Sequence, residues 1–518
     1  FGERRRGADF VAALLERSRM AEAGGQSDEA GIYAQRAFDG VLDGRARIGV
    51  EAHKVSFVDL GEDTAHHHLR LLHRHGASAD ELLSAIEEWR LQVFRDVHRS
   101  TLPTNQPAKD ARGLVNDISA AIDPGEVFVS YAIGPDVSFA VLVDADGVSR
   151  TVRLPADITE VTALVGAVSR WLSVEDSLSR NYIALDRLAP DLVAALQQLH
   201  AILIEPLDIP DGIERLIVSP DRTLVGLPWP ALIDPRETMI GSVMEWLGRP
   251  SYRFLLDRIG VVVLPSVRVH LSRQEPSGEQ KGTTADTGKP NALLVGGFAG
   301  VSAQMLVEAV PHLADGPLGR AGLNALTAGA DELRSIQQSL RTSHTVSVLL
   351  DETTRSKADA AGVGQATRAG VIERLPAADI VHVAAHGLFN PQAPMESVVF
   401  LDTAERLETL TARDFLETDL SASRLVVLSA CQTAASEVAA GSETFGFLRG
   451  LMGSGARSVL LTEWSVDDAT TAEWFGAFYR ELDGADIAGA AREAALAVRN
   501  NRNHPFFWAA PTVYGAWR

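Results

Sequence analysis

Cysteine is nearly absent from this chain, which holds a single one, Cys431, among 518 residues. One thiol excludes disulfides within the chain, and it excludes zinc or iron–sulfur sites built from several cysteines. Such sparse cysteine use fits a reducing compartment, so we expect a cytoplasmic protein. The role of Cys431 therefore has to be inferred from its position in the sequence.

Long apolar runs are also missing. No segment approaches the roughly 20 consecutive apolar residues that a membrane helix needs. The first six residues, FGERRR, lack the apolar core of a signal peptide. We therefore expect no membrane contact, while the start at Phe1 rather than at methionine leaves an upstream export signal open.

Basic residues are outnumbered, with 48 lysines and arginines against 68 aspartates and glutamates, which gives a formal charge of −20. This charge repels nucleic acids and anionic membranes, so we expect no direct nucleic-acid binding. It favours a cationic partner or a basic peptide. Hydrophobic residues at 46% and charged residues at 22% are typical of a globular protein.

The N-terminal part shows helical periodicity and almost no strand signal over residues 4–100. We predict a helical region over residues 1–112. Residues 22–40 fit one degenerate helical hairpin, similar to a tetratricopeptide repeat, although no fixed period supports a repeat. This region is expected to bind a regulatory protein or complex.

Five of the fourteen histidines fall in one short window, namely His66, His67, His68, His73 and His75. One interpretation is a metal-binding or pH-sensing cluster. The other is a solvated helix face or a turn. We favour the second, because no acidic or cysteine ligand pattern lies beside these histidines.

Strand-forming runs begin at residue 127 and fall into two series. The polar stretch between the two series, at 272–290, is predicted to be a flexible linker. The first series has strands expected at residues 127–133, 139–143, 216–219 and 261–264. The second has strands expected at residues 292–296, 346–350, 380–384, 425–429 and 458–461. Continuous apolar runs in the second series are typical of parallel strands buried on both faces. The predicted fold is therefore α/β, with tandem units over residues 113–271 and 291–518.

Two strands of the second unit run into residues that can carry chemistry, His386 and Cys431. Ligand-binding side chains gather at the carboxyl edge of a parallel sheet, so neighbouring strands would bring this pair together. A thiolate can attack a carbonyl while an imidazole transfers the proton to the leaving amine. The N–H groups of Gly387 and Cys431 could then stabilise the oxyanion.

Each residue alone has an ordinary structural explanation, because a lone cysteine is most often a small buried apolar group and a strand histidine is most often a hydrogen-bonded neutral group. Their spacing favours chemistry, since His386 precedes Cys431 by 45 residues, close to the caspase interval of about 50. His382 and His386 also form an H-x-x-x-H pair. Position 383 is valine rather than the glutamate of a zinc peptidase, so we expect no metal and take His382 as a core or supporting group.

Several blocks together resemble a known family: residues 378–387 (ADIVHVAAHG), 424–433 (RLVVLSACQT), 455–459, 464–468 and 504–509. Over residues 125–518 the chain is similar to the CHAT domain, a caspase-like cysteine peptidase domain commonly found behind tetratricopeptide repeats. The resemblance implies a caspase-like parallel-sheet fold in two units, of which the first is non-catalytic. It also implies Cys431 as nucleophile, His386 as general acid or base, Gly387 as oxyanion support, and no cofactor.

Residues 464–468 also resemble the corresponding strand end of separase, where an aspartate receives a basic P1 side chain. Carried onto this chain, that position is Asp468, with Asp467 beside it. A carboxylate there would select arginine or lysine by ion pairing. Both aspartates could equally cap the helix that begins near residue 469, where acidic residues are favoured.

These features together predict a bacterial, cytoplasmic endopeptidase that cleaves a protein substrate and is gated by its N-terminal region or by a partner. The sequence from Gln432 to Leu448 holds neither lysine nor arginine, so with a basic P1 preference we expect no self-cleavage there. One alternative is a catalytically silent scaffold that keeps the fold for binding. Another is an acyltransferase that uses the same nucleophile.

Overall fold

The computed structural model describes residues 2–46, 51–95, 111–173, 177–237, 252–274, 288–311, 317–357, 363–390, 393–402, 407–432, 444–482 and 486–518. Its contacts divide the chain into two compact units. Unit 1 comprises Phe1–Ala163, Ile202–Thr223 and Leu264–Glu275. Unit 2 comprises Leu164–Ala201, Leu224–Val263 and Pro276–Arg518. The predicted boundaries at 113–271 and 291–518 stay a prediction, and the expected linker at 272–290 lies mostly outside the described residues.

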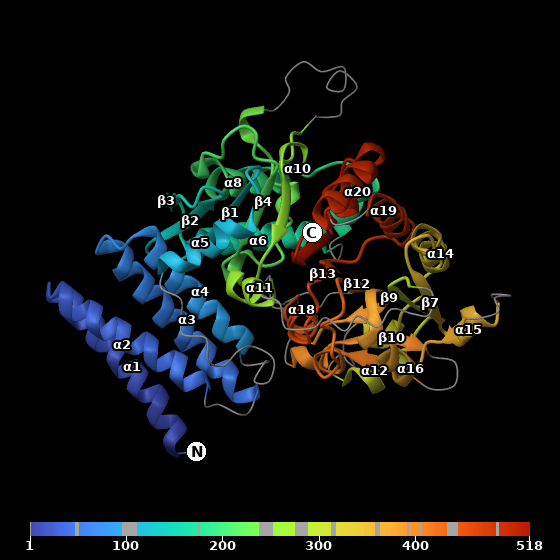
Figure 1. Ribbon diagram of the computed structural model, residues 1–518, viewed down its shortest axis with the longest axis horizontal. Coiled ribbons are helices and arrows are strands. Elements are labelled where there is room, and N and C mark those ends of the chain that lie inside the picture. Colours follow the sequence, from blue (N-terminus) through green and yellow to red (C-terminus); the bar gives the residue numbers. More distant parts are fainter. Residues whose placement is uncertain are drawn as a thin grey trace. The chain divides into compact units, whose positions relative to one another are not determined.

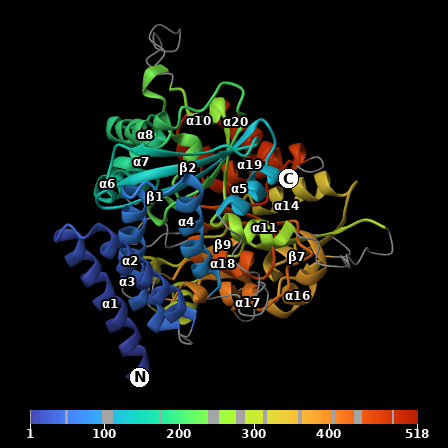
Figure 2. The ribbon, with the colours of Figure 1, turned by 60° about the vertical axis from the view of Figure 1, so that its left-hand side comes forward.

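The N-terminal region of unit 1 is helical, as predicted. Its helices are α1 (Gly2–Ala23), α2 (Ser27–Ala46), α3 (Glu51–Arg74), α4 (Ala79–Arg95) and α5 (Ala111–Ala121). Helices α1 and α2 form a hairpin, and α3 lies beside them (Figure 1, Figure 2). Val11, Leu14 and Leu15 of α1 pack against Ala37 and Val41 of α2. The apolar spacing along α1 thus forms a buried stripe, as helical periodicity requires.

His66, His67, His68 and His73 lie on α3, and the exposed His75 lies in the turn that follows it. The predicted solvated face or turn fits His75 and is wrong for His67 and His68. The side chains of His67 and His68 are buried, and the ring of His68 stacks on Phe38 at 4.8 Å. Burial lowers the pKa of His68 to about 4, so it is a neutral core group at pH 7. No cluster of three or more metal-ligating side chains occurs within the described ranges.

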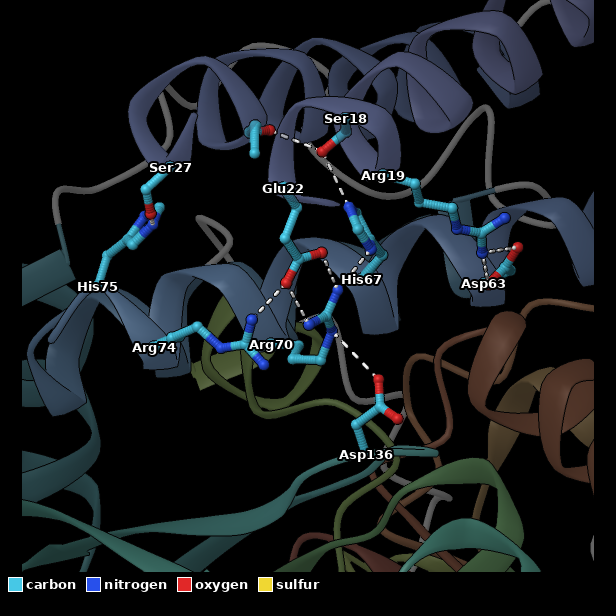
Figure 3. Close-up of polar contacts among 11 residues, drawn as sticks. Ser18, Arg19, Glu22, Ser27, Asp63, His67, Arg70, Arg74, His75 and Asp136 are labelled. Carbon is cyan, nitrogen blue, oxygen red and sulfur yellow. Dashed lines mark hydrogen bonds and ion pairs between the residues drawn. The ribbon is translucent and has the colours of Figure 1, made fainter. Parts of the chain in front are cut away.

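Polar contacts join α3 to α1 and explain this burial (Figure 3). Ser18 contacts His67 Nε2 at 2.8 Å, and Arg70 donates to both carboxylate oxygens of Glu22 at 2.6 Å. The sequence pattern could not distinguish this interface between α1 and α3 from a solvated helix face, because both helices contribute polar residues to it.

The sheet of unit 1 has the strand order β3-β2-β1-β4. Its strands are β1 (Glu126–Ile133), β2 (Ser138–Asp144), β3 (Ser149–Leu154) and β4 (Arg215–Ser219). β1 pairs antiparallel with β2 and parallel with β4. The strands predicted at 127–133, 139–143 and 216–219 are confirmed, whereas β3, which is half-exposed, was not predicted.

A buried ion pair joins α4 to this sheet. The side chain of Glu87 is fully buried and accepts from Arg90, Ser219 and Ser266 at 3.0 Å each. Arg90 also donates to Ser130 Oγ at 2.7 Å. Both charges are therefore surrounded by hydrogen-bond partners, which is what makes a buried pair tolerable.

The sheet of unit 2 has the strand order β5-β14-β13-β12-β9-β6-β7-β8. These strands are β5 (Gly260–Val263), β6 (Asn291–Gly297), β7 (Thr345–Leu350), β8 (Gly364–Gln365), β9 (Ala378–Leu388), β12 (Leu425–Gln432), β13 (Ser458–Thr462) and β14 (Pro511–Gly515). Pairing is parallel from β13 through β12, β9, β6 and β7 to β8. All five strands predicted for the second series are confirmed. The antiparallel β14 and the hairpin of β10 (Val398–Asp402) and β11 (Glu408–Thr411) were not predicted.

Helices accompany both sheets. Two bear directly on the site described below: α14 (Gly329–Leu340) and α19 (Asp468–Glu481), which pack against each other. The others are α6 (Ile158–Leu172), α7 (Ser177–Ala184), α8 (Pro190–Leu203), α10 (Leu255–Arg258), α11 (Val267–Gln274), α12 (Ala303–Ala309), α13 (Pro317–Ala321), α15 (Glu352–Arg355), α16 (Arg368–Arg374), α17 (Ala412–Leu416), α18 (Thr444–Gly453), α20 (Ile487–Asn501) and α21 (Pro505–Trp508). Within the described part of the chain, no helix combines the length and the apolar character needed to cross a membrane.

Replacing Arg90 by alanine should destabilise the fold strongly, because the buried Glu87 carboxylate would lose its counter-charge. We expect a loss of about 3–5 kcal/mol in the free energy of unfolding, measured by urea denaturation. Arg112→Ala is the matched control, since the Arg112 side chain is 60% exposed and pairs with Asp80 at 3.4 Å. The control should change by less than about 1 kcal/mol. Equal, small losses in both variants would show that the buried pair has no structural role.

Candidate active site

The two predicted catalytic residues lie on neighbouring strands. β9 and β12 pair in parallel, and their register places Cys431 opposite His386 and Gln432 opposite Gly387. β9 continues beyond His386 to Leu388, because β10 pairs antiparallel along its other edge, with Phe400 opposite His386. The expectation that the strands are neighbours is confirmed. The backbone of Cys431 belongs to β12, while its side chain lies outside the part of the structure that is described.

The His386 imidazole is held by a main-chain acceptor. Its side chain is 6% exposed, and Nε2 lies 2.7 Å from the carbonyl oxygen of Asn324. A carbonyl can only accept, so Nε2 carries the proton and Nδ1 of the neutral ring keeps a lone pair. Burial lowers the pKa of His386, and the opposing effects of the Asn324 carbonyl and the Asp468 charge only partly offset it. The ring is therefore neutral at pH 7 and able to accept a proton.

Gly387 is required by packing. A Cβ built at this position would lie 2.9 Å from the Cβ of Ala430 on the neighbouring strand, closer than two such atoms normally approach. The glycine thus allows β9 and β12 to pair closely at the level of His386 and Cys431. The oxyanion role expected for Gly387 and for the N–H of Cys431 stays a prediction.

His382 lies fully buried on β9, four residues before His386. Its Nε2 contacts Glu332 of α14 at 2.8 Å, and its Nδ1 lies 3.2 Å from the hydroxyl of Tyr479 on α19. Burial raises the pKa of Tyr479 well above 10, so that hydroxyl stays protonated and can donate. The interpretation of His382 as a core or supporting group is confirmed, because all its partners are internal.

The two aspartates predicted to bind substrate make different contacts. Asp467 is the N-cap of α19 and accepts from the backbone N–H of Thr470 at 3.1 Å. Asp468 is the first residue of α19, and its Oδ2 accepts from the backbone N–H of Ala328 at 2.7 Å and from the Thr327 hydroxyl at 3.3 Å. Asp467 therefore caps α19, as the capping alternative expects. A P1-binding role for Asp468 or for Asp467 stays a prediction.

Sequence reasoning missed the segment from Asn324 to Ala328, which contacts both His386 and Asp468. Asn324 acts through its carbonyl oxygen and Ala328 through its N–H, and every residue type offers these groups. No side-chain signature could have identified them.

Comparison with known proteins identifies the family. The family model described as the CHAT domain matches residues 193–516, which is more than half of the chain. The chain belongs to the CHAT domain family. The match spans β9 and β12 and so includes both His386 and Cys431. No curated protein matches this CHAT domain protein.

Solved structures similar to this CHAT domain protein include two crystal structures of the Saccharomyces cerevisiae separase–securin complex, determined at 3.0 Å and at 2.6 Å. The first has a TM-score of 0.47 at 9% identity and covers 98% of this chain and 40% of that one. The second has a TM-score of 0.45 at 9% identity and covers 99% and 40%. The chain thus spans about two fifths of the length of those separase chains.

Gly387→Ala should destabilise this CHAT domain, because the new Cβ meets that of Ala430. We expect a loss of about 1–3 kcal/mol in the free energy of unfolding. Adding Ala430→Gly removes the opposing atom, so the double variant should be more stable than the sum of the two single losses implies. Denaturant unfolding of the four proteins measures this coupling. Strict additivity would mean that the two atoms do not meet.

Proposed function

We propose that this CHAT domain protein is a cysteine endopeptidase, with Cys431 as nucleophile and His386 as general base and acid. The supporting observation is the register of β9 and β12, which pairs the backbone of Cys431 with that of His386. A buried neutral imidazole with a proton-accepting nitrogen is what such a nucleophile needs beside it.

The proposed reaction begins when the Cys431 thiol gives its proton to Nδ1 of His386 and its sulfur attacks the scissile carbonyl carbon. The C–N bond then breaks, the imidazolium returns the proton to the leaving amine, and a thioester remains on Cys431. Water, deprotonated by His386, then attacks the thioester carbon, the C–S bond breaks, and the imidazolium returns its proton to the Cys431 sulfur as the acid leaves. The proposed reaction needs no metal or cofactor, because His386 accepts and returns the proton in both halves of the reaction.

Two backbone N–H groups, those of Gly387 and Cys431, are the proposed donors to the oxyanion of the tetrahedral intermediate. They fit this role because they belong to adjacent strands at the level of the dyad. Donors fixed by a sheet cost no reorganisation as negative charge develops, which is how an oxyanion site accelerates acyl transfer. The substrate is proposed to be a protein segment with a basic P1 residue, which the excess of 68 acidic over 48 basic residues favours whichever role Asp468 has.

Control of this activity is proposed to lie in the helical region at residues 1–112, which would bind a regulatory protein. The α1–α2 hairpin exposes large apolar side chains, with Phe10 55% exposed, Met20 72% and Ile32 59%. Exposed apolar groups on packed helices are compatible with a protein partner.

Cys431→Ala should abolish peptide cleavage and leave the unfolding transition unchanged, because β12 keeps its backbone pairing. His386→Ala should reduce kcat/KM by at least about 1,000-fold, since the thiol then has no neighbouring base. An irreversible electrophile carrying a basic P1 mimic should label the wild-type chain and spare Cys431→Ala, read by intact mass. Full residual cleavage by Cys431→Ala would refute the nucleophile. No labelling and no cleavage, with the partner present, would favour the silent scaffold.

A peptide library should show cleavage after arginine or lysine, and active protein should keep the segment from Gln432 to Leu448 intact. This segment lacks both basic residues, so the enzyme has no preferred site there. Mass mapping of active material tests the second part. An obligatory cut between Gln432 and Leu448 would contradict a single-chain enzyme with basic P1 specificity.

A further inference from the structure

The segment between Leu323 and Ala328 connects two parts of the candidate site. At its start, the carbonyl oxygen of Asn324 accepts from Nε2 of His386 at 2.7 Å. At its end, the N–H of Ala328 donates to Oδ2 of Asp468 at 2.7 Å. The imidazole and the carboxylate therefore lie at two ends of one five-residue loop, 324–328, which leads into α14.

Three sets of contacts hold this loop and the residue before it. Leu323 forms an isolated antiparallel bridge with Val301, and the N–H of Leu326 donates to the carbonyl of Phe298 at 2.9 Å. These two contacts are made by main-chain groups. Asp468 supplies a side-chain contact, and its carboxylate also accepts from the Thr327 hydroxyl at 3.3 Å. Asn324 itself is exposed, and main-chain contacts of the residues on either side hold the chain at this point.

The helices that begin beside Ala328 and at Asp468 are both held to β9, by residues one turn after Ala328 and about three turns after Asp468. Glu332 on α14 and Tyr479 on α19 both contact the buried ring of His382 on β9. Helix α19, at whose start Asp468 lies, is therefore held to the strand that carries His386. A carboxylate on a fixed helix can hold a loop in one position.

We propose that Asp468 is a positioning residue, which holds the 324–328 loop so that the Asn324 carbonyl orients the His386 imidazole toward Cys431. The inference rests on the proposed function and assigns to Asp468 a role in the catalytic step itself. The negative charge of Asp468 also supports this role. Among the described residues, Asp468 is the ionised group whose charge favours protonation of the His386 imidazole.

A P1-binding role for the Asp468 carboxylate predicts different kinetic effects from a positioning role. An S1 aspartate contacts the substrate, so its loss raises KM for basic P1 residues and leaves neutral ones unaffected. A positioning aspartate acts on His386, so its loss lowers kcat by one common factor for every P1 residue. The two roles are therefore separated by comparing kcat and KM on matched arginine and norleucine substrates.

The test compares Asp468→Ala, which removes both the acceptor and the charge, with Asp468→Asn, which keeps an acceptor oxygen for Ala328 and removes only the charge. For Asp468→Ala we expect kcat to fall roughly 10- to 100-fold on both substrates, with KM within about twofold of wild type. Asp468→Asn should recover much of kcat, while the acid limb of kcat/KM moves to lower pH. Losing a nearby anion lowers the pKa of the base, and the neutral base is the active form.

Asp486→Asn is the matched control, because Asp486 caps α20 by accepting from Gly489 and lies outside the candidate site. It should match wild type in kcat, KM and pH profile. Melting curves show whether each variant is folded. If Asp468→Ala fails to fold, the shifted acid limb of Asp468→Asn decides the question.

The rate of Cys431 alkylation by iodoacetamide against pH separates this inference from the proposed function, because the chain has no other thiol. Wild type should react at lower pH than His386→Ala, and Asp468→Ala should approach His386→Ala. If wild type and His386→Ala react alike, the proposed function fails. If wild type is accelerated and Asp468→Ala equals wild type, the positioning role is overturned while the dyad stands. A defect confined to KM for arginine substrates also overturns it and assigns Asp468 to S1.

Discussion

The parallel pairing of β9 with β12 is the constraint on which the rest of the site depends. It fixes the backbone of Cys431 opposite that of His386 and leaves Gln432 opposite Gly387. A shift of the register by one residue would turn one of the pair to the opposite face of the sheet. Gly387 helps to protect this register, since any larger residue would meet Ala430.

The groups that hold the His386 imidazole in place lie outside its own strand, β9. The Asn324 carbonyl sets the proton on Nε2, and the loop that carries it is tied to α19 through Asp468. Beneath this layer, the buried contacts of His382 with Glu332 and Tyr479 hold both helices to β9. Orientation of a base by a partner that does not itself react is a general feature of acyl-transfer sites. In the mechanism proposed above, the base is His386 and the partner is the Asn324 main-chain carbonyl, so the orientation of the base depends on how firmly the loop is held.

Much of the fold followed from the sequence, because apolar runs such as residues 380–384 and 425–429 are typical of parallel strands buried on both faces. The proximity of His386 and Cys431 followed from their places at strand ends. The antiparallel strand β14 was missed, since its sequence is short and mixed in polarity. The buried histidines of α3 were misjudged because their partners, Ser18 and Phe38, lie on other helices. Membership of the CHAT domain family agrees with the resemblance seen in the sequence blocks.

Direct trapping of an acyl-enzyme tests the central claim that Cys431 and His386 form a working dyad. The full chain, with its partner, would be mixed with a slowly hydrolysed ester of a basic P1 residue, quenched in acid and digested. The account predicts a thioester adduct on the peptide that contains Cys431, which decays in wild type as the hydrolysed acid appears. Substrate turnover without an adduct on Cys431, or an adduct at any other residue, would contradict it.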